Sequence, residues 1–319
     1  MLYIGIDVGG TNIAAGVMDE EGRIIGRSSL KIKVPCPHRE LCSQILDAAK
    51  SALRDCSATL NDVTAIGVGI PGTVNSKEGV VTFSSNLFVE DFRIKELLQK
   101  VIDKPIAIEN DADAAAYGEF VQGALQNSKN GLMLTLGTGI GCGMIVDGKL
   151  YRGAVGAAGE VGHMVIDMDG RLCNCGRHGC WERYASATGL IQTTREYLIE
   201  HPDRNSSMMA LIGGNINNIE GKTAFFGKEQ GLQLAAEIVD IYIHHLGIGL
   251  VNVLNLLDPD TVCIGGGVAA AGDALLDPLK DYVAKTQYKR GGDHVELCLA
   301  TLGNDAGIIG AAYLAKNLL

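Results

Sequence analysis

The amino-terminal region contains a strand–turn–strand pattern, which reads IGIDVGGTNIAAGVMD over residues 4–19. A short apolar strand ends near Asp7, a turn rich in glycine follows, and a second apolar strand begins at Ile13. Because glycine has no Cβ, the N–H groups of such a turn can close around a phosphate. Asp7 could hold a Mg²⁺ ion beside that phosphate. An ordinary β-hairpin would give the same pattern, so its meaning depends on the rest of the chain.

The same pattern returns in the middle of the chain. Residues 132–152 predict a strand, a glycine turn (GTGIGCG), a second strand, a hairpin turn at Asp147-Gly148 and a third strand. A third glycine stretch, Gly265–Gly267, lies between a predicted strand and a predicted helix. Three turns of the phosphate-binding type in a repeated chain indicate two related α/β halves with a nucleotide site.

Strands and helices alternate through the first 121 residues, which is typical of an α/β protein. The predicted strands are 3–8, 13–18, 23–33, 63–70 and 105–109, and the predicted helices are 39–54, 92–101 and 113–121. Apolar residues at helical spacing support the helix at 39–54, namely Leu41, Ile45, Ala48, Ala49 and Ala52. The polar stretch 201–222 predicts loops.

Length and charge limit the class of protein. A chain of 319 residues is long enough for two domains. The net charge of −10 argues against a nucleic-acid partner, which would require clustered lysine and arginine. The amino-terminal residues show no signal-peptide pattern, and the apolar region 241–257 is interrupted by histidine and asparagine. We therefore expect a cytoplasmic protein without a membrane span, in which residues 241–257 form a buried helix.

Three of the nine cysteines are closely spaced. Cys173, Cys175 and Cys180 lie within eight residues, and the other six are scattered and predict free thiols. Three thiolates and one imidazole, from His163 or His178, would make a closed tetrahedral zinc site. A disulfide or free thiols are the alternatives, and a cytosolic chain disfavours the disulfide.

Five motifs, in order along the whole chain, resemble the ROK family of sugar kinases, which has the actin–hexokinase fold. The motifs are DVGGTN at 7–12, ENDA at 109–112, LGTGIG at 136–141, the pair GEVGH at 159–163 and CNCGRHGCWE at 173–182, and GGG at 265–267 with the closing segment 303–310. The resemblance implies a duplicated, ribonuclease H-like α/β fold with two domains and a cleft between them. We expect a small domain at 1–118, joined by a terminal helix at 305–319, and a large domain at 119–304 that carries the zinc loop.

The resemblance also implies a metal set and a sugar site. It selects His163 over His178 as the fourth zinc ligand, beside Cys173, Cys175 and Cys180. Zinc on one imidazole nitrogen would fix the ring of His163 and aim the other nitrogen at a ligand. The residues implied to bind the sugar are Gly72, Asn86, Asn110, Asp111, Glu160, His163 and Glu182. Solvated surface carboxylates are the alternative interpretation of Glu160 and Glu182.

Asp111 is the predicted catalytic base. It follows a predicted strand at the point where a helix begins, and a carboxylate at a helix N-terminus stays ionised. A sugar hydroxyl must lose its proton as it attacks the γ-phosphoryl group, and an aspartate accepts this proton in kinases. A helix N-cap is the alternative role of Asp111, but Asp113 is the better cap candidate.

ATP and Mg²⁺ are the expected cofactors, in addition to the structural zinc. The residues implied to bind them are Asp7, Gly9, Gly10, Thr11, Asn12, Thr138, Gly139, Gly266 and Gly267. These turns contain no lysine or arginine, so Mg²⁺ and backbone dipoles would neutralise the phosphate charge.

The resemblance implies ATP-dependent phosphorylation of a hexose at its 6-hydroxyl, with glucose as the preferred substrate. Kinases acting on N-acetylglucosamine, N-acetylmannosamine or fructose would share nearly every motif. A sugar-sensing regulator is a more distant alternative, since the family also contains transcriptional repressors. The family often forms dimers or tetramers, which implies a homo-oligomer.

Overall fold

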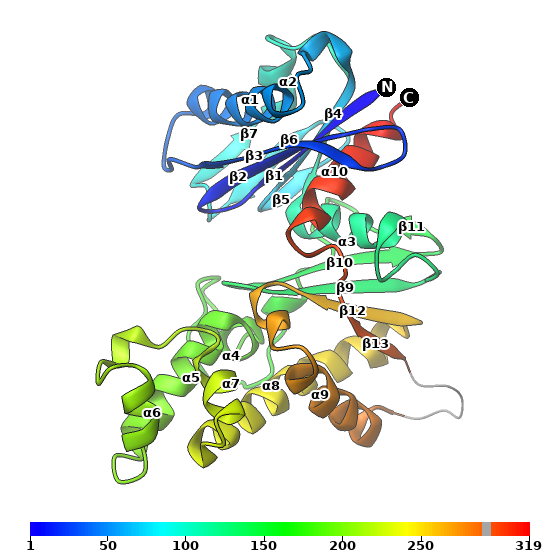
Figure 1. The fold of residues 1–319 in the computed structure, drawn as a ribbon. Coiled ribbons are helices and arrows are strands. Elements are labelled where there is room, and N and C mark those ends of the chain that lie inside the picture. The colour runs from blue at the N-terminus through cyan, green and yellow to red at the C-terminus, as the bar shows by residue number, and fades with distance from the viewer. Residues whose placement is uncertain (289–294) are drawn as a thin grey trace. The chain divides into compact units, whose positions relative to one another are not determined.

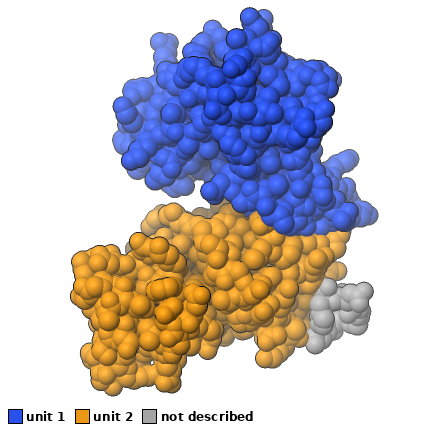
Figure 2. Space-filling model, in the orientation of Figure 1, with its two compact units in different colours: residues 1–133, 143–159, 301–319 blue, residues 134–142, 160–300 orange. Residues whose placement is uncertain are grey.

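The computed structural model describes residues 1–288 and 295–319. Contacts within the chain divide it into two units, which Figure 2 draws in different colours. Unit 1 comprises residues 1–133, 143–159 and 301–319, and unit 2 comprises residues 134–142 and 160–300. Both units are therefore assembled from segments that are distant in the sequence. The domain limits expected from the sequence, near residues 118 and 305, stay a prediction.

Unit 1 is built on a five-stranded sheet whose first three strands form the predicted meander (Figure 1). The strands are β1 (Leu2–Val8), β2 (Asn12–Met18), β3 (Ile24–Lys31), β4 (Val63–Ile70) and β8 (Ile106–Asn110). In the order β3-β2-β1-β4-β8, the first two pairings are antiparallel and the last two are parallel. The parallel strands β1, β4 and β8 therefore end along one edge, which is where open α/β sheets bind ligands.

Helices pack on both faces of this sheet (Figure 1). On one face, α1 (His38–Asp55) buries the five apolar residues that predicted it against a core that includes Ile4 and Ile6. On the other face, α10 (Ala306–Lys316) packs against β1 and β4. A Cβ on Gly5 or on Gly67 would lie 1.8 Å from a carbonyl oxygen of α10. Glycine at these two positions therefore allows the terminal helix to approach the sheet closely.

Unit 1 also contains short elements that the sequence analysis placed wrongly or did not find. They are α2 (Ile94–Gln99), α3 (Asp111–Gln122), η1 (Leu60–Asp62), η5 (Gly303–Asp305) and a sheet of β5 (Thr73–Asn75), β6 (Val80–Ser84) and β7 (Val89–Phe92). The predicted helix at 92–101 is shortened to α2, because its first residue belongs to strand β7. The predicted helix at 113–121 begins two residues earlier, at Asp111.

The second five-stranded sheet repeats the arrangement of the first. Its strands are β9 (Gly131–Leu136), β10 (Ile140–Val146), β11 (Lys149–Leu150), β12 (Thr261–Gly265) and β13 (Glu296–Leu299), in the order β11-β10-β9-β12-β13. In both sheets the first three strands along the chain lie in reverse order, and the next two extend the opposite edge. Asp147 and Gly148 have positive φ in the hairpin between β10 and β11, as predicted. The common strand order confirms the internal repeat.

Unit 2 contains helices of different lengths, several of which pack against the longest one. They are η2 (Val161–His163), α4 (Glu182–Ala185), α5 (Ala187–Glu200), α6 (Ser206–Leu211), η3 (Ile216–Asn218), α7 (Thr223–Glu229), α8 (Gln233–Leu257), η4 (Gly267–Ala271) and α9 (Asp273–Thr286). Helix α8 is long and apolar enough to cross a membrane, but 61% of its apolar window is buried inside the fold. It is the core helix predicted at 241–257, extended by eight residues. The stretch 201–222, predicted as loops, contains α6 and η3.

Candidate functional site

The first glycine turn joins β1 to β2 in unit 1. The N–H of Gly9 donates to the carbonyl of Asn12 over 2.8 Å, and the N–H of Ile32 donates to the carbonyl of Thr11 over 3.0 Å. Gly10, Thr11 and Asn12 are exposed. The turn is thus closed by its own backbone on one side and open to a ligand on the other.

Two carboxylates lie at the ends of parallel strands β1 and β8, which are separated in the sheet by β4. Asp7 is in β1, and Asp111 follows β8 as the first residue of α3. Burial, followed by the negative charge of Asp111, raises the pKa of Asp7 from its ordinary value of 3.8 to about 7. Asp7 also contacts α10, since a Cβ on Gly307 would lie 2.8 Å from its carboxyl carbon. Two carboxylates that repel each other in this way can be stabilised by a divalent cation.

Asn110 caps the helix that carries Asp111. Its Oδ1 accepts hydrogen bonds from the backbone N–H groups of Ala112 at 2.9 Å and Asp113 at 3.1 Å, and its Nδ2 donates to the carbonyl of Gly72 at 3.0 Å. The prediction that Asp113 caps this helix is therefore wrong, because the helix begins two residues earlier and Asp113 lies in its first turn. This cap brings together Gly72, Asn110 and Asp111, three of the predicted sugar residues. Asn86 is exposed in the turn between β6 and β7.

A partly buried ion pair supports this strand end. Glu109, the last residue before Asn110, is 3% exposed, and its Oε2 accepts a hydrogen bond from Nε of Arg152 at 2.5 Å. Its Oε1 accepts from the hydroxyl of Ser76 at 2.7 Å. The sequence analysis did not assign Arg152, because an ion pair between residues 43 positions apart leaves no local spacing signal.

Four predicted metal ligands in unit 2 converge. The ligand atoms of His163, Cys173, Cys175 and Cys180 all lie within 4.8 Å of one another. Nδ1 of His163 is 3.6 Å from Sγ of Cys173, and the Sγ atoms of Cys175 and Cys180 are also 3.6 Å apart. Ligands about 2.3 Å from a tetrahedral zinc ion would be separated by roughly 3.7 Å. The cluster therefore fits Zn²⁺, and the sulfur separation is too long for a disulfide.

The local backbone explains how this cluster forms. Gly176 and Gly179 have positive φ, and a Cβ on Gly179 would lie 1.5 Å from the carbonyl oxygen of Asp167. The backbone N–H of Arg177 lowers the pKa of Cys175 to about 6, whereas burial raises the pKa of Cys180 to about 12. His178 lies outside the cluster, with Nδ1 at 2.9 Å from the carbonyl oxygen of Gly170.

The remaining predicted sugar residues lie beside the metal cluster. With Nδ1 of His163 directed at the cysteines, its Nε2 is 3.9 Å from Oε2 of Glu160. Glu182 follows the cluster as the first residue of α4, and its Oε2 accepts a hydrogen bond from the N–H of Ile140 at 2.9 Å. Glu160, His163 and Glu182 thus belong to one group in unit 2. Gly72, Asn86, Asn110 and Asp111 belong to unit 1.

The second glycine turn, between β9 and β10, lies next to the third glycine stretch. A Cβ on Gly266 would lie 2.6 Å from the backbone nitrogen and oxygen of Leu136, the last residue of β9. Gly267 begins η4 and has no neighbouring atom within 4 Å of a Cβ. The structure therefore brings together Thr138, Gly139, Gly266 and Gly267, the nucleotide residues predicted in the second half of the chain.

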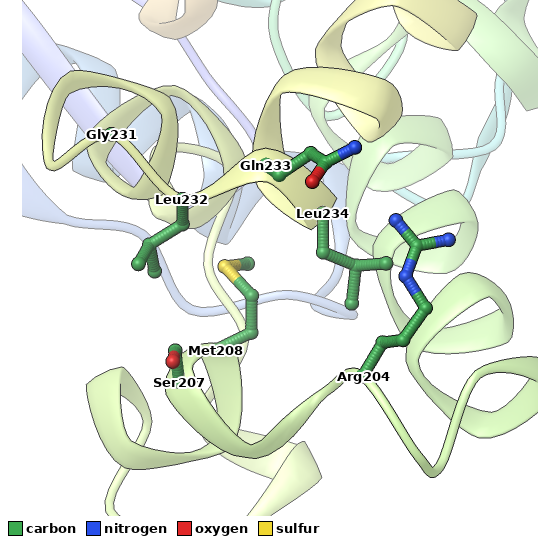
Figure 3. A pocket seen from close by; sticks show the side chains of 7 residues that line it. All are labelled: Arg204, Ser207, Met208, Gly231, Leu232, Gln233 and Leu234. Atoms are coloured by element: carbon green, nitrogen blue, oxygen red, sulfur yellow. The ribbon is translucent and has the colours of Figure 1, made fainter.

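Two cavities of the described residues lie elsewhere in unit 2. One, of about 320 Å³, is lined by Arg204, Ser207, Met208, Gly231, Leu232, Gln233 and Leu234 (Figure 3). Arg204 is paired there with Glu237 at 2.5 Å. The other, of about 670 Å³, lies around Phe226. Neither is lined by a residue that the sequence analysis predicted for the site.

Comparisons with known proteins agree on one family. The model of the ROK family matches residues 3–318. The glucokinase of Streptomyces coelicolor is 38% identical over 322 residues, which cover 99% of this chain and 98% of that protein. The solved structure of a ROK family glucokinase from Streptomyces griseus, in complex with glucose and AMPPNP, is 36% identical. It superposes with a TM-score of 0.87 over 99% of this chain and all of that one.

The chain is also similar to longer regulators. The xylose repressor of Bacillus spizizenii is 32% identical over 98% of this chain but over only 76% of its own length. The likeness to solved ROK structures, together with the repeated sheet, confirms the predicted duplicated α/β fold of the actin–hexokinase type.

Proposed function

This chain belongs to the ROK family, and we propose that it is a glucokinase that transfers the γ-phosphoryl group of ATP to the 6-hydroxyl of glucose. Identity to glucokinases over the full length of both chains supports the reaction and the sugar. The observation that carries the proposal is the position of Asp111, at the N-terminus of α3, beside Asp7 and the cap formed by Asn110.

Asp111 is the proposed general base. The positive end of the dipole of α3 favours its ionised form, and its own N-terminal turn supplies a hydrogen bond from the N–H of Ala112 at 3.0 Å. The carboxylate accepts the proton of the 6-hydroxyl as the oxygen attacks the γ-phosphorus. Most of the catalytic effect in phosphoryl transfer comes from position and charge. Glu109 and Arg152 serve this requirement by fixing the end of β8.

The phosphates are bound by the two glycine turns in this proposal. Gly9, Gly10, Thr11 and Asn12 form the first turn, Thr138 and Gly139 belong to the second, and Gly266 and Gly267 contact the adenosine. Asp7 would hold Mg²⁺, which would supply positive charge to the phosphate oxygens when bound. Asp7 is the only one of these residues with a carboxylate, and its ionisation would be favoured by the cation.

The sugar is bound in this proposal by polar residues from both halves of the chain. The carboxylates of Glu160 and Glu182 accept hydrogen bonds from sugar hydroxyls, and Nε2–H of His163 donates one to a sugar oxygen when Nδ1 holds zinc. Gly72, Asn86 and Asn110 are the sugar residues proposed in unit 1. An analogue that lacks one hydroxyl leaves a charged acceptor without its donor, which gives strong discrimination. Zn²⁺ on Cys173, Cys175, Cys180 and Nδ1 of His163 would fix the imidazole, so that Nε2 remains for the sugar.

The cell compartment and the assembly are part of the proposal as well. No disulfide joins any of the nine cysteines, all of which are among the described residues, and this supports a reducing compartment such as the cytoplasm. We propose a homo-oligomer, as the family resemblance implies.

The alternatives are a kinase for another hexose and a sugar-responsive regulator. The similarity to xylose repressors supports the alternative of a sugar-responsive regulator. Against it, Asp7 and Asp111 are both present and lie close enough for the charge of one to raise the pKa of the other. A regulator without activity would not require this pair.

A coupled assay of ADP release tests the proposal. MgATP is supplied with glucose, mannose, fructose, N-acetylglucosamine and N-acetylmannosamine, and Asp111→Asn is measured alongside the natural protein. We expect glucose to give the highest kcat/KM, and the variant to lower kcat by about 10²- to 10⁴-fold. Preference for an acetylated sugar would retain the mechanism and change the substrate. Binding of sugar without turnover would favour the regulator.

A further inference from the structure

The second glycine turn is held by residues that follow the metal cluster. The hydroxyl of Thr188 donates to the carbonyl of Thr138 over 2.8 Å, and the N–H of Ala187 donates to the carbonyl of Gly137 over 2.8 Å. At the other end of the turn, Oε2 of Glu182 accepts from the N–H of Ile140 over 2.9 Å. Three hydrogen bonds from a seven-residue segment, 182–188, therefore fix the backbone of a four-residue turn.

The side chain of Glu182 packs tightly against Gly139 in the middle of the turn. A Cβ on Gly139 would lie 2.2 Å from Oε2 of Glu182. The carboxylate thus packs directly against the turn, in addition to accepting its hydrogen bond. The position of the Glu182 side chain and the conformation of the turn backbone therefore depend on each other.

Segment 182–188 is itself anchored on helix α8. Trp181 is fully buried, and its Nε1 donates to the carbonyl of His245 over 3.0 Å. The hydroxyl of Tyr242 donates to the carbonyl of Ala185 over 2.8 Å. A Cβ on Gly249 would lie 2.1 Å from the indole ring of Trp181. The long buried helix therefore provides a rigid base from which Glu182 and Thr188 reach the turn.

We propose that Thr188 and Glu182 are positioning residues for the turn at 137–140, and that Glu182 links the sugar to the ATP phosphates. This inference rests on the proposed function, in which Glu182 binds a sugar hydroxyl and the turn binds phosphate. A carboxylate can accept several hydrogen bonds, so a sugar hydroxyl can use Oε1 while the N–H of Ile140 uses Oε2. A bound sugar then restricts the carboxylate to the orientation that holds the turn. Because such coupling is reciprocal, ATP favours sugar binding to the same extent.

Thr188 separates the positioning role from sugar binding, since only Glu182 is proposed to contact the sugar. In Thr188→Val the hydroxyl is lost and the shape is kept. We expect the KM for ATP to rise about three- to tenfold, the effect of one lost neutral hydrogen bond, with the KM for glucose changed less than about twofold. Thr188→Ser, which retains the hydroxyl, restores the KM for ATP.

Thr194→Val is the matched control on the same helix. The hydroxyl of Thr194 donates to the carbonyl of Leu190 within α5, so the same substitution removes a hydrogen bond that does not involve the turn. Its KM for ATP should equal that of the natural protein. Equal KM values for ATP in Thr188→Val and the natural protein, or equal increases in Thr188→Val and Thr194→Val, would overturn the positioning role.

Calorimetric titration of AMPPNP with and without saturating glucose tests the link through Glu182. We expect glucose to tighten AMPPNP binding by at least about threefold in the natural protein, and this factor to fall toward one in Glu182→Gln. An active natural protein in which glucose has no effect on AMPPNP affinity would overturn the link alone. A natural protein that phosphorylates no sugar with ATP would overturn the proposed function, and the inference with it.

Discussion

Replacing Asp7 by asparagine should make the free protein more stable at neutral and alkaline pH. The pKa of Asp7 is raised from 3.8 to about 7 by burial and by the charge of Asp111. The folded state therefore binds a proton more tightly than the unfolded state does. This contribution to stability is fully present below pH 4 and is lost as the pH rises through 7. Asparagine has the same shape and no charge, so the variant does not lose stability as the pH rises through 7.

The pKa values set the size of the effect. The interval between 3.8 and about 7, at 1.36 kcal/mol per pH unit, corresponds to about 4 kcal/mol at pH 8 as an upper limit. At pH 5 the effect is about 2 kcal/mol or less, because the folded state still holds the proton there and the pH is only about one unit above the pKa of the unfolded state. In a chain of this size, 4 kcal/mol corresponds to a rise in Tm of roughly 6 °C.

Scanning calorimetry between pH 4 and 8.5, without nucleotide or added Mg²⁺, measures the difference in Tm between Asp7→Asn and the natural protein. Asp62→Asn is a control of opposite sign, because hydrogen bonds from the backbone and hydroxyl of Thr59 lower the pKa of Asp62. Asp62→Asn should be less stable than the natural protein above about pH 5, and this deficit should stay constant up to pH 8.5, because both folded and unfolded Asp62 are ionised there. A Tm difference for Asp7→Asn that is independent of pH, or a variant less stable at pH 8, would refute the reasoning.

Three further variants test other parts of the structure. Mass spectrometry should find one zinc ion per chain in the natural protein, and Cys175→Ser or treatment with a chelator should reduce this content and lower Tm. The free energy of unfolding should fall by about 3 kcal/mol if free zinc exceeds Kd a hundredfold. A natural protein without zinc would contradict the metal assignment. Glu119→Ala should cost at least about 3 kcal/mol by denaturant unfolding, because the buried carboxylate accepts from Ala124, Thr301 and Leu302; unchanged stability would contradict this. Gly67→Ala places a Cβ 1.8 Å from the carbonyl oxygen of Ala311 and should destabilise by about 3 kcal/mol or more, whereas Gly10→Ala, which meets no atom within 4 Å, should leave Tm nearly unchanged.

Local patterns predicted the parts of the fold that depend on local chemistry. The meander of β1 to β3 follows from apolar runs separated by turns, and α1 follows from helical spacing of its buried face. The strand–turn–strand pattern at residues 4 and 132 predicted the repeat, which the common strand order confirms. The small sheet of β5 to β7 was not predicted, because strands of three to five residues give almost no periodic signal.

The site was predictable as a set of residue types and much less as a set of contacts. The close spacing of the cysteines indicated a metal cluster, but its fourth ligand came from the family resemblance. Asn110 caps α3 in place of Asp113, a difference of one helical turn that sequence patterns do not resolve. The pairing of Glu109 with Arg152 and of Glu182 with Ile140 joins residues about 40 positions apart. Only the tertiary structure brings such residues together.

The central claim is transfer of phosphate from ATP to the 6-hydroxyl of glucose, and phosphorus NMR of the reaction products tests it most directly. The protein, MgATP and glucose should yield glucose 6-phosphate and ADP in equal amounts. ADP with inorganic phosphate and no sugar phosphate, or a sugar phosphorylated at another hydroxyl, would contradict the account.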